Sequence, residues 1–138
     1  MDKKISALII DQHPLIRYVI RGLVERKGGQ VYETGGELES IKMASMYKPN
    51  LIIVDFVEYQ SVQFNLIHKL MIMSPKSKIL IYTSLMSVFY LNKCLEIGVH
   101  GYVCKSDEIV NIDGAIDAVI FGGGYFPPLD LPMHPKIK

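Results

Sequence analysis

Five short apolar segments recur along the chain, and the four stronger ones are continuous runs rich in Ile and Val. A strand with one face in water alternates apolar and polar residues, whereas a strand buried on both faces is apolar throughout. The continuous runs therefore indicate a parallel sheet that is covered on both sides. The expected strands are residues 5–10, 30–34 (the weaker run), 51–54, 79–82 and 102–104.

Segments with helical features separate these runs, at residues 14–27, 37–47, 61–73, 86–97 and 108–121. Pro14 suits the first turn of a helix, and Gly28 and Gly98 suit helix ends. Ser106 and Asp107 are residue types that cap the start of a helix. The strand ends are separated by 24, 20, 28 and 22 residues, which is typical of βαβ units. The sequence therefore predicts an α/β fold, a doubly wound parallel sheet of five strands.

The composition limits the class of protein. With 138 residues, 49% of them hydrophobic, the chain has room for one domain with a core. Fifteen Lys and Arg against 14 Asp and Glu give a net charge of +1, without the basic surface of an independent nucleic-acid binder. Two cysteines, Cys94 and Cys104, are too few for a disulfide framework, and no apolar run reaches the roughly 18 residues of a membrane span. We expect a soluble, cytoplasmic domain.

Polar residues follow each of the four strong strands: Asp11 and Gln12, Asp55, Thr83 and Ser84, Lys105 and Ser106. With strand order 2-1-3-4-5 these strands are neighbours, so the polar groups converge at the carboxyl edge, where doubly wound sheets bind ligands. Two carboxylates favour a hard divalent cation such as Mg²⁺. A lysine and a hydroxyl suit a phosphoryl group. An aspartate that accepts a phosphoryl group needs these parts together.

These segments resemble the receiver domain of two-component response regulators, most closely the NarL/LuxR-type group, which carries a C-terminal helix-turn-helix domain. The matching stretches are residues 9–17 (IIDQHPLIR), 49–55 (PNLIIVD), 81–84 (IYTS) and 98–106 (GVHGYVCKS). The resemblance extends over residues 5–128, nearly the whole chain. It implies a flavodoxin-like, CheY-like fold with the strand order 2-1-3-4-5.

Residue by residue, the resemblance also implies roles at the candidate site. Asp55 is the expected phosphoacceptor, and it shares a Mg²⁺ ion with Asp11 and the backbone carbonyl of Val57. Thr83 is the hydroxyl that follows the phosphoryl group, and Lys105 is the ion-pair partner of the aspartates.

Three residues have competing interpretations. By resemblance, Tyr102 is a switch aromatic that swings inward on activation, but from its position alone it is a half-buried strand aromatic. Thr83 could instead be simply a β-branched strand residue, although the site role is favoured. His13 is a candidate metal ligand, although a residue that shapes the turn into the first helix is the simpler interpretation. The four histidines are scattered, at positions 13, 68, 100 and 134. That spacing argues against zinc.

The chain departs from the family pattern at two places. Gln12 stands where the family has a second acid, which should weaken Mg²⁺ binding because one charge is missing. The loop after the phosphoacceptor has Tyr59 and Gln63 in place of the usual Pro and Gly, which puts the Val57 carbonyl ligand in question. Glu58 is a candidate substitute acid.

The favoured function is a signal receiver: a sensor histidine kinase passes a phosphoryl group to Asp55, which switches homodimerisation or the output of a transcription regulator. Such a domain is a phosphoacceptor rather than an enzyme. The alternative, motivated by Gln12 and the altered loop, is a degenerate receiver that serves as a dimerisation or protein-interaction module. A flavodoxin-like cofactor binder is disfavoured, because residues 11–14 lack the glycines or hydroxyls of a phosphate-binding loop.

The C-terminal segment differs in composition from the rest. Residues 1–124 are predicted to be the receiver, with the glycines at 122–124 ending the last helix and forming a hinge. Residues 125–138 hold four prolines and are predicted to be a linker. In the resembling group a DNA-binding domain would follow Lys138, and we expect DNA to be bound only through such a domain, with no role for a membrane.

Overall fold

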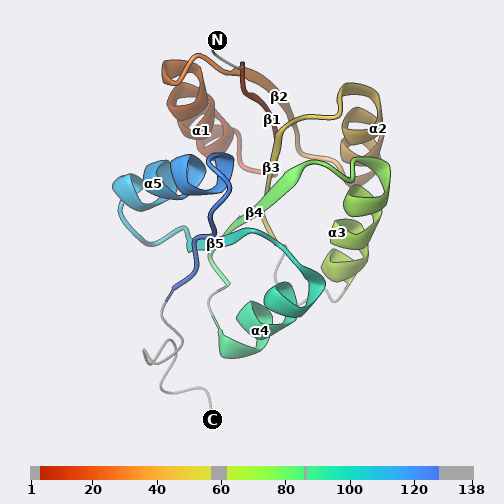
Figure 1. The fold of residues 1–138 in the computed structure, drawn as a ribbon, viewed down its shortest axis with the longest axis vertical. Helices are drawn as coiled ribbons and strands as arrows, with labels where there is room; N and C mark the ends of the chain where they lie inside the picture. The colour runs from red at the N-terminus through yellow and green to blue at the C-terminus, as the bar shows by residue number, and fades with distance from the viewer. Residues whose placement is uncertain (1–3, 57–61, 86, 128–138) are drawn as a thin grey trace.

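The computed structural model describes residues 4–56, 62–85 and 87–127. Its centre is one sheet of five parallel strands in the order β2-β1-β3-β4-β5 (Figure 1). The strands are β1 (Ser6–Ile10), β2 (Gln30–Thr34), β3 (Leu51–Val54), β4 (Lys78–Thr83) and β5 (Gly101–Cys104). The predicted fold class and strand order are therefore confirmed, and each strand boundary lies within one residue of its predicted position.

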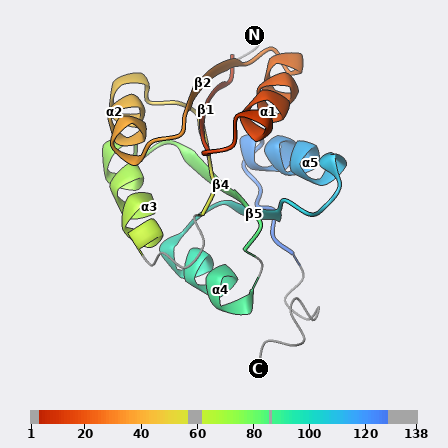
Figure 2. The same cartoon turned by 180° about the vertical axis from the view of Figure 1, so that it is seen from behind.

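Helices cover both faces of the sheet, with α1 and α5 on one side and α2, α3 and α4 on the other (Figures 1 and 2). The described helices are α1 (Pro14–Arg26), α2 (Glu37–Tyr47), α3 (Val62–Met73), α4 (Val88–Ile97) and α5 (Ile109–Ile120). This layering explains the continuous apolar runs, because successive strand residues point to opposite faces and both faces are buried.

The central strand β3 shows the two cores most clearly. Ile52 lies in the core beneath α2, α3 and α4, where it joins Leu70 of α3. Ile53, the next residue, lies in the core beneath α1 and α5, where it joins Leu23 and Ile116. All four residues of β3 are buried, so a polar residue within this strand would have no access to water.

Two helix starts differ from the predictions. The α5 helix begins at Ile109 with Glu108 as its N-cap, and neither Ser106 nor Asp107 caps it. The reason is local: the Asp107 N–H donates to the Cys104 carbonyl at 3.1 Å and closes a turn at the end of β5. The α4 helix begins at Val88, after Ser87, whose hydroxyl accepts a hydrogen bond from the Tyr90 N–H at 3.2 Å. The predicted first residues of the third and fourth helices, 61 and 86, lie outside the described residues.

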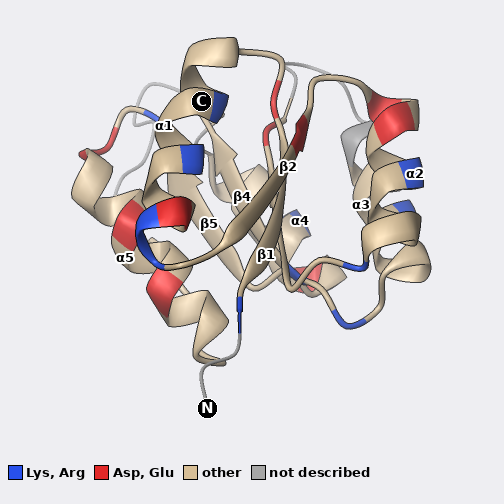
Figure 3. Ribbon diagram, turned by 90° about the horizontal axis from the view of Figure 1, so that it is seen from above, with Lys and Arg blue, Asp and Glu red and all other residues tan. Residues whose placement is uncertain are grey.

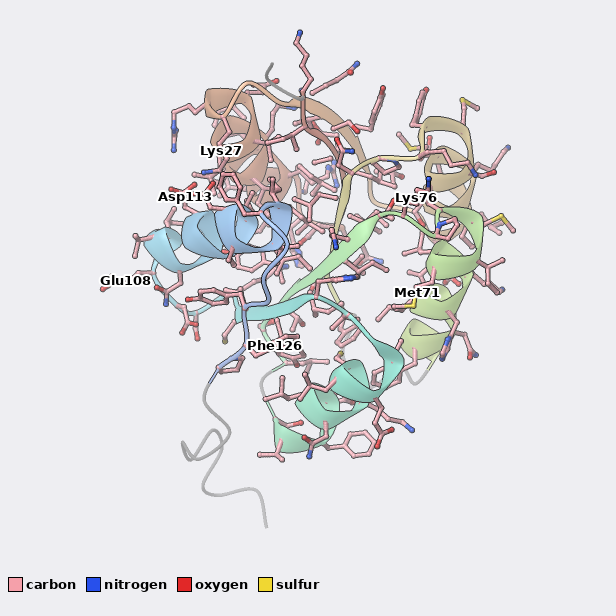
Figure 4. The ribbon with its side chains drawn as sticks, viewed as in Figure 1. Lys27, Met71, Lys76, Glu108, Asp113 and Phe126 are labelled. Atoms are coloured by element: carbon pink, nitrogen blue, oxygen red, sulfur yellow. The ribbon has the colours of Figure 1, made fainter. Side chains whose placement is uncertain are left out.

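The segment after α5 lies along the edge strand. Gly122, at φ 95°, follows the last turn of the helix. The Tyr102 N–H then donates to the Tyr125 carbonyl at 2.8 Å, and the Tyr125 N–H donates to the His100 carbonyl at 3.2 Å. Phe126 packs against the core on the α4 side (Figure 4). The first residues of the predicted linker therefore contact the sheet, whereas 128–138 lie outside the described residues, so the domain boundary at 124 stays a prediction.

Charged residues of both signs are interspersed on the surface, and α1 and α2 each carry both (Figure 3). One ion-pair group joins the two helices of one face: Lys27 Nζ lies 2.6 Å from Asp113 Oδ1 and 3.1 Å from Asp117 Oδ1 (Figure 4). Burial lowers the pKa of Lys27, but the hydrogen bonds to these two carboxylates outweigh burial and raise it. Within the described ranges, every helix is too short or too polar to cross a membrane.

Gly101 should be intolerant of a larger side chain. A Cβ at this position would lie 2.5 Å from Leu80 Cδ1 and 3.2 Å from Val119 Cγ2, so Gly101→Ala should lower the free energy of unfolding by about 1–3 kcal/mol. Gly114 is the control, because it is exposed in α5 and a Cβ added there would have no neighbour within 4 Å. Gly114→Ala should instead stabilise the protein by about 0.5–1 kcal/mol. Urea unfolding of both variants checks this, and equal effects would contradict it.

Candidate functional site

The sheet register brings the carboxyl ends of β1, β3, β4 and β5 to one edge of the sheet. Ile10 pairs with Val54, and Val54 pairs with Ile81, so the residues after β1 and β3 lie side by side. The pairing continues past the strands: the Asp55 N–H donates to the Ile10 carbonyl at 3.0 Å, and the Lys105 N–H donates to the Thr83 carbonyl at 2.8 Å. Backbone hydrogen bonds therefore fix the Cα positions from which the candidate side chains extend.

The Lys105 ammonium connects the two aspartates at this edge. Its Nζ lies 2.8 Å from Asp11 Oδ2 and 2.9 Å from Asp55 Oδ2. The three side chains are nearly buried, with exposed fractions of 11% for Lys105, 3% for Asp11 and 10% for Asp55. The sequence prediction that these residues converge is confirmed by these distances. Their roles in phosphoryl transfer stay predictions.

Burial and charge pairing act against each other in this cluster, and the outcome differs between Asp55 and Lys105. Burial raises the pKa of Asp55, and the hydrogen bond and charge of Lys105 oppose that effect only in part, while the charge of Asp11 adds to it. For Lys105, burial lowers the pKa, but the hydrogen bonds and charges of both aspartates outweigh burial and raise it. Lys105 therefore stays charged at neutral pH, whereas the ionised form of Asp55 is disfavoured by its surroundings.

Asp55 also has an open acceptor. Its Oδ2 accepts a hydrogen bond from Lys105, whereas its buried Oδ1 has no close hydrogen-bond partner among the described residues; the Thr83 hydroxyl is near enough to lower the pKa of Asp55. An unpaired buried carboxylate oxygen is costly, since it has lost its water without a replacement. Two carboxylates and one ammonium leave an excess of negative charge, and the open oxygen marks where a cation or an electrophile would be favourable.

His13 is part of the cluster, although the sequence favoured only a role in the turn. Its Nδ1 lies 2.7 Å from Asp11 Oδ1, 3.8 Å from Asp55 Oδ2 and 3.3 Å from Lys105 Nζ. The turn role is also present, because His13 is the N-cap residue of α1, and its N–H donates to Asp11 Oδ1 at 2.8 Å. The spacing Asp-x-His before a helix is the sequence signal that could have placed the imidazole here.

Arg17 was not singled out from the sequence, but it positions the same loop. Its guanidinium donates to the Asp11 carbonyl oxygen at 2.5 Å and to Glu33 of β2 at 2.9 Å. Arg21, one turn later on α1, also pairs with Glu33, at 2.6 Å. Burial raises the pKa of Glu33, but the hydrogen bonds from Arg21 and Arg17 outweigh it and lower that pKa. This network ties the backbone of Asp11 to α1 and β2.

Thr83 and Tyr102 meet at the segment after β4. Thr83, which is fully buried, accepts a hydrogen bond from the Leu85 N–H at 3.1 Å through Oγ1. The Tyr102 hydroxyl donates to the carbonyl oxygen of the same residue, Leu85. Tyr102 has an exposed fraction of 0%, so the interpretation as a half-buried aromatic is wrong: the ring points into the core. Burial raises the pKa of its hydroxyl, which therefore stays protonated.

The remaining candidate residues either make no contact with the cluster that the structure describes or lie outside the described residues. Gln12 is exposed and makes no described side-chain hydrogen bond, so its place as a doubtful metal ligand stays a prediction. Val57 and the candidate acid Glu58 lie outside the described residues. Cys94 and Cys104 are buried, as core residues should be, and burial raises the pKa of the Cys94 thiol to about 12.

This fold and site define a class of protein. The model of the response regulator receiver domain matches residues 7–117, and the chain belongs to that family. The matched interval contains the whole cluster of Asp11, His13, Asp55 and Lys105. The chain is thus a receiver domain of the two-component response regulators.

Two relatives are transcription regulators. The positive transcription regulator of virulence factors BvgA from Bordetella pertussis is 31% identical over 127 residues, which are 91% of this chain and 61% of BvgA. The DNA-binding transcriptional activator EvgA from Escherichia coli K12 is 29% identical over 126 residues, 88% of this chain and 60% of EvgA. The chain therefore spans about three-fifths of the length of these relatives.

Solved structures confirm the receiver fold. A LuxR-family response regulator from Aurantimonas sp. SI85-9A1 has a TM-score of 0.78 at 23% identity, covering 91% of both chains. The isolated receiver domain of RcsB from Salmonella enterica serovar Typhimurium, in the presence of the phosphomimetic BeF3⁻, has a TM-score of 0.79 at 20% identity, covering 92% of this chain and 96% of that one.

Proposed function

We propose that Asp55 accepts a phosphoryl group from the phosphohistidine of a sensor histidine kinase. The observation that carries the proposal is the state of its carboxylate, which is nine-tenths buried, bound by Lys105 at one oxygen and without a close hydrogen-bond partner among the described residues at the other. Such a costly arrangement at the carboxyl edge of a doubly wound sheet favours a chemical use over a structural one.

The transfer needs few groups. The carboxylate oxygen of Asp55 attacks phosphorus, the phosphorus–nitrogen bond to the donor imidazole breaks, and that nitrogen takes up a proton; nothing is oxidised or reduced. Lys105 stands 2.9 Å from Asp55 Oδ2, where its charge offsets that of the incoming group. The Thr83 hydroxyl accepts from the Leu85 N–H and lowers the pKa of Asp55 through a side-chain hydrogen bond, so it lies where it could donate to a phosphoryl oxygen on Asp55.

The residues present also fit Mg²⁺, the cation that receiver domains bind through acidic residues. Asp11 and Asp55 would hold it, since together they exceed the charge of Lys105 and one oxygen of Asp55 has no close partner among the described residues. When bound, the ion offsets negative charge on the transferred phosphoryl group. Because Gln12 is neutral and exposed, we propose that Mg²⁺ is bound more weakly than by a site with a second acid in that loop.

The switch residues connect the site to a surface segment. Phe56 directly follows Asp55, and its ring lies 6.5 Å from that of Tyr102, centroid to centroid. Tyr102 and Thr83 both hydrogen-bond to Leu85, ahead of α4. A phosphoryl group that draws on the Thr83 hydroxyl would therefore act on the same segment that holds Tyr102. We propose that this segment passes the signal to a homodimer contact and to a separate DNA-binding domain of a transcription regulator, as the relatives suggest.

Phosphorylation of intact protein tests the proposal. After incubation with acetyl phosphate and Mg²⁺, the intact mass should increase by one phosphoryl group, and Asp55→Asn should abolish the increase. Asp107→Asn, which removes an exposed acid at the end of β5 but outside the cluster, should leave it unchanged. Because burial raises the pKa of Asp55, Asp55→Asn should unfold at no lower urea concentration than the parent, so its inactivity is not loss of fold. No mass increase in the parent, or the same increase in Asp55→Asn, would favour the protein-interaction alternative.

A further inference from the structure

We infer that His13 is a third ligand of the cation site and gives it a preference for first-row transition-metal ions such as Mn²⁺ over Mg²⁺. The inference rests on the proposed function, because it concerns the same site. One donor atom each from Asp11, His13 and Asp55 can be chosen so that all three lie within 4.8 Å of one another.

The distances suit ligands around a single ion. Ligand atoms bound at about 2.1 Å lie roughly 3 Å apart when adjacent and roughly 4 Å apart when opposite. His13 Nδ1 lies 2.7 Å from Asp11 Oδ1 and 3.8 Å from Asp55 Oδ2. Both distances are within about 0.3 Å of the separation between two ligand atoms of one ion. The imidazole is 63% exposed overall, yet this nitrogen faces the two carboxylates.

The three donors already surround one positive charge. Lys105 Nζ lies 2.8 Å from Asp11, 2.9 Å from Asp55 and 3.3 Å from His13 Nδ1. The cluster is therefore built around a cationic centre. The second observation is independent of these contacts: the Asp55 side chain is nine-tenths buried, and its Oδ1 is unpartnered among the described residues. A carboxylate offers about four acceptor sites, so Asp55 has capacity left for a metal ion.

The position of the imidazole is set by the backbone. Pro14 is the first residue of α1 and restricts the conformation of His13, which sits at φ −96° and ψ 108°. The His13 N–H is held by Asp11 Oδ1 at 2.8 Å. The ring therefore needs little reorganisation to bind an ion, and a metal can take the place of the Nδ1 proton while the other nitrogen carries the remaining one.

The kind of donor decides the kind of ion. Mg²⁺ is bound by oxygen ligands, whereas an imidazole nitrogen suits later first-row ions such as iron, nickel and zinc. The oxygen donor that the loop could add, Gln12, is exposed and is a neutral amide rather than a carboxylate. A donor set of two carboxylates and one imidazole is thus better matched to a first-row transition-metal ion than to Mg²⁺, and Mn²⁺, which carboxylates suit, is the paramagnetic representative used in the test.

Pulsed electron paramagnetic resonance of the Mn²⁺-loaded protein, with any affinity tag removed, tests the inference. Electron spin-echo modulation should show a directly bound ¹⁴N nucleus, which His13→Asn should remove. Asparagine is the replacement because it is a good N-cap residue and so preserves the start of α1. Calorimetric titration with each ion should show that the parent prefers Mn²⁺ and that His13→Asn lowers this preference about tenfold.

His68→Asn, which removes an exposed histidine of α3, is the matched control and should keep both the ¹⁴N signal and the preference. Absence of the ¹⁴N signal in the parent, or its persistence in His13→Asn, overturns the inference. The phosphorylation test with Mg²⁺ separates the two proposals. Phosphorylation without a ¹⁴N signal overturns only the ligand role of His13, and a ¹⁴N signal without phosphorylation overturns only the proposed function.

Discussion

Lys105→Met should lower the free energy of unfolding by about 3 kcal/mol at neutral pH when divalent cations are absent. The substitution keeps most of the side-chain volume but leaves Asp11 and Asp55, which are 3% and 10% exposed, without their shared ammonium. Without that charge the pKa of Asp55, which burial already raises, should rise further. Urea unfolding of the variant and its parent in a chelator measures the loss.

The pH dependence of that loss separates charge from packing. A carboxyl group with a raised pKa in the folded state destabilises the fold above that pKa, and the penalty disappears as the pH falls and the native state binds the proton. The difference between Lys105→Met and the parent should therefore shrink on acidification, and Mg²⁺ should reduce it at neutral pH. Lys69→Met, an exposed lysine of α3, should change stability by less than about 0.5 kcal/mol. An equal, pH-independent loss in both variants would contradict the counter-ion role.

Tyr102→Ala should cost about 3–5 kcal/mol, because it removes a fully buried ring from the core between β5 and α4. Tyr102→Phe keeps the ring and removes only the hydroxyl that donates to the Leu85 carbonyl, so it should cost about 1 kcal/mol. Chemical denaturation of the two variants checks both values.

A second measurement tests whether the Tyr102 hydroxyl holds the segment after β4. In Tyr102→Phe the Leu85 amide, which donates to Thr83 Oγ1, should exchange its hydrogen faster than in the parent. Tyr18→Phe, at an exposed tyrosine of α1, should leave both stability and exchange unchanged. Unchanged exchange at Leu85 in Tyr102→Phe would show that the hydrogen bond does not hold this segment.

The strand boundaries could be predicted from the sequence to within about one residue. A strand that is buried on both faces consists of an uninterrupted run of apolar residues, and such a run is visible in the sequence. Helix starts were less predictable. Ser106 and Asp107 have capping residue types, but the turn closed by the Cys104 carbonyl takes up the Asp107 N–H, and α5 begins later. Residue type alone does not say which of two local hydrogen bonds forms.

The convergence of Asp11, Asp55 and Lys105 followed from the sequence by itself, because the carboxyl ends of parallel strands share one edge of the sheet. Only the tertiary structure decided which atoms pair there. Lys105 bridges both carboxylates, and its Nζ lies 3.3 Å from Nδ1 of His13, 92 residues away in the chain. One buried oxygen of Asp55 has no close hydrogen-bond partner among the described residues. Side-chain direction, burial and hydrogen-bond partners arise between segments far apart in sequence, so periodicity, which is local, cannot specify them.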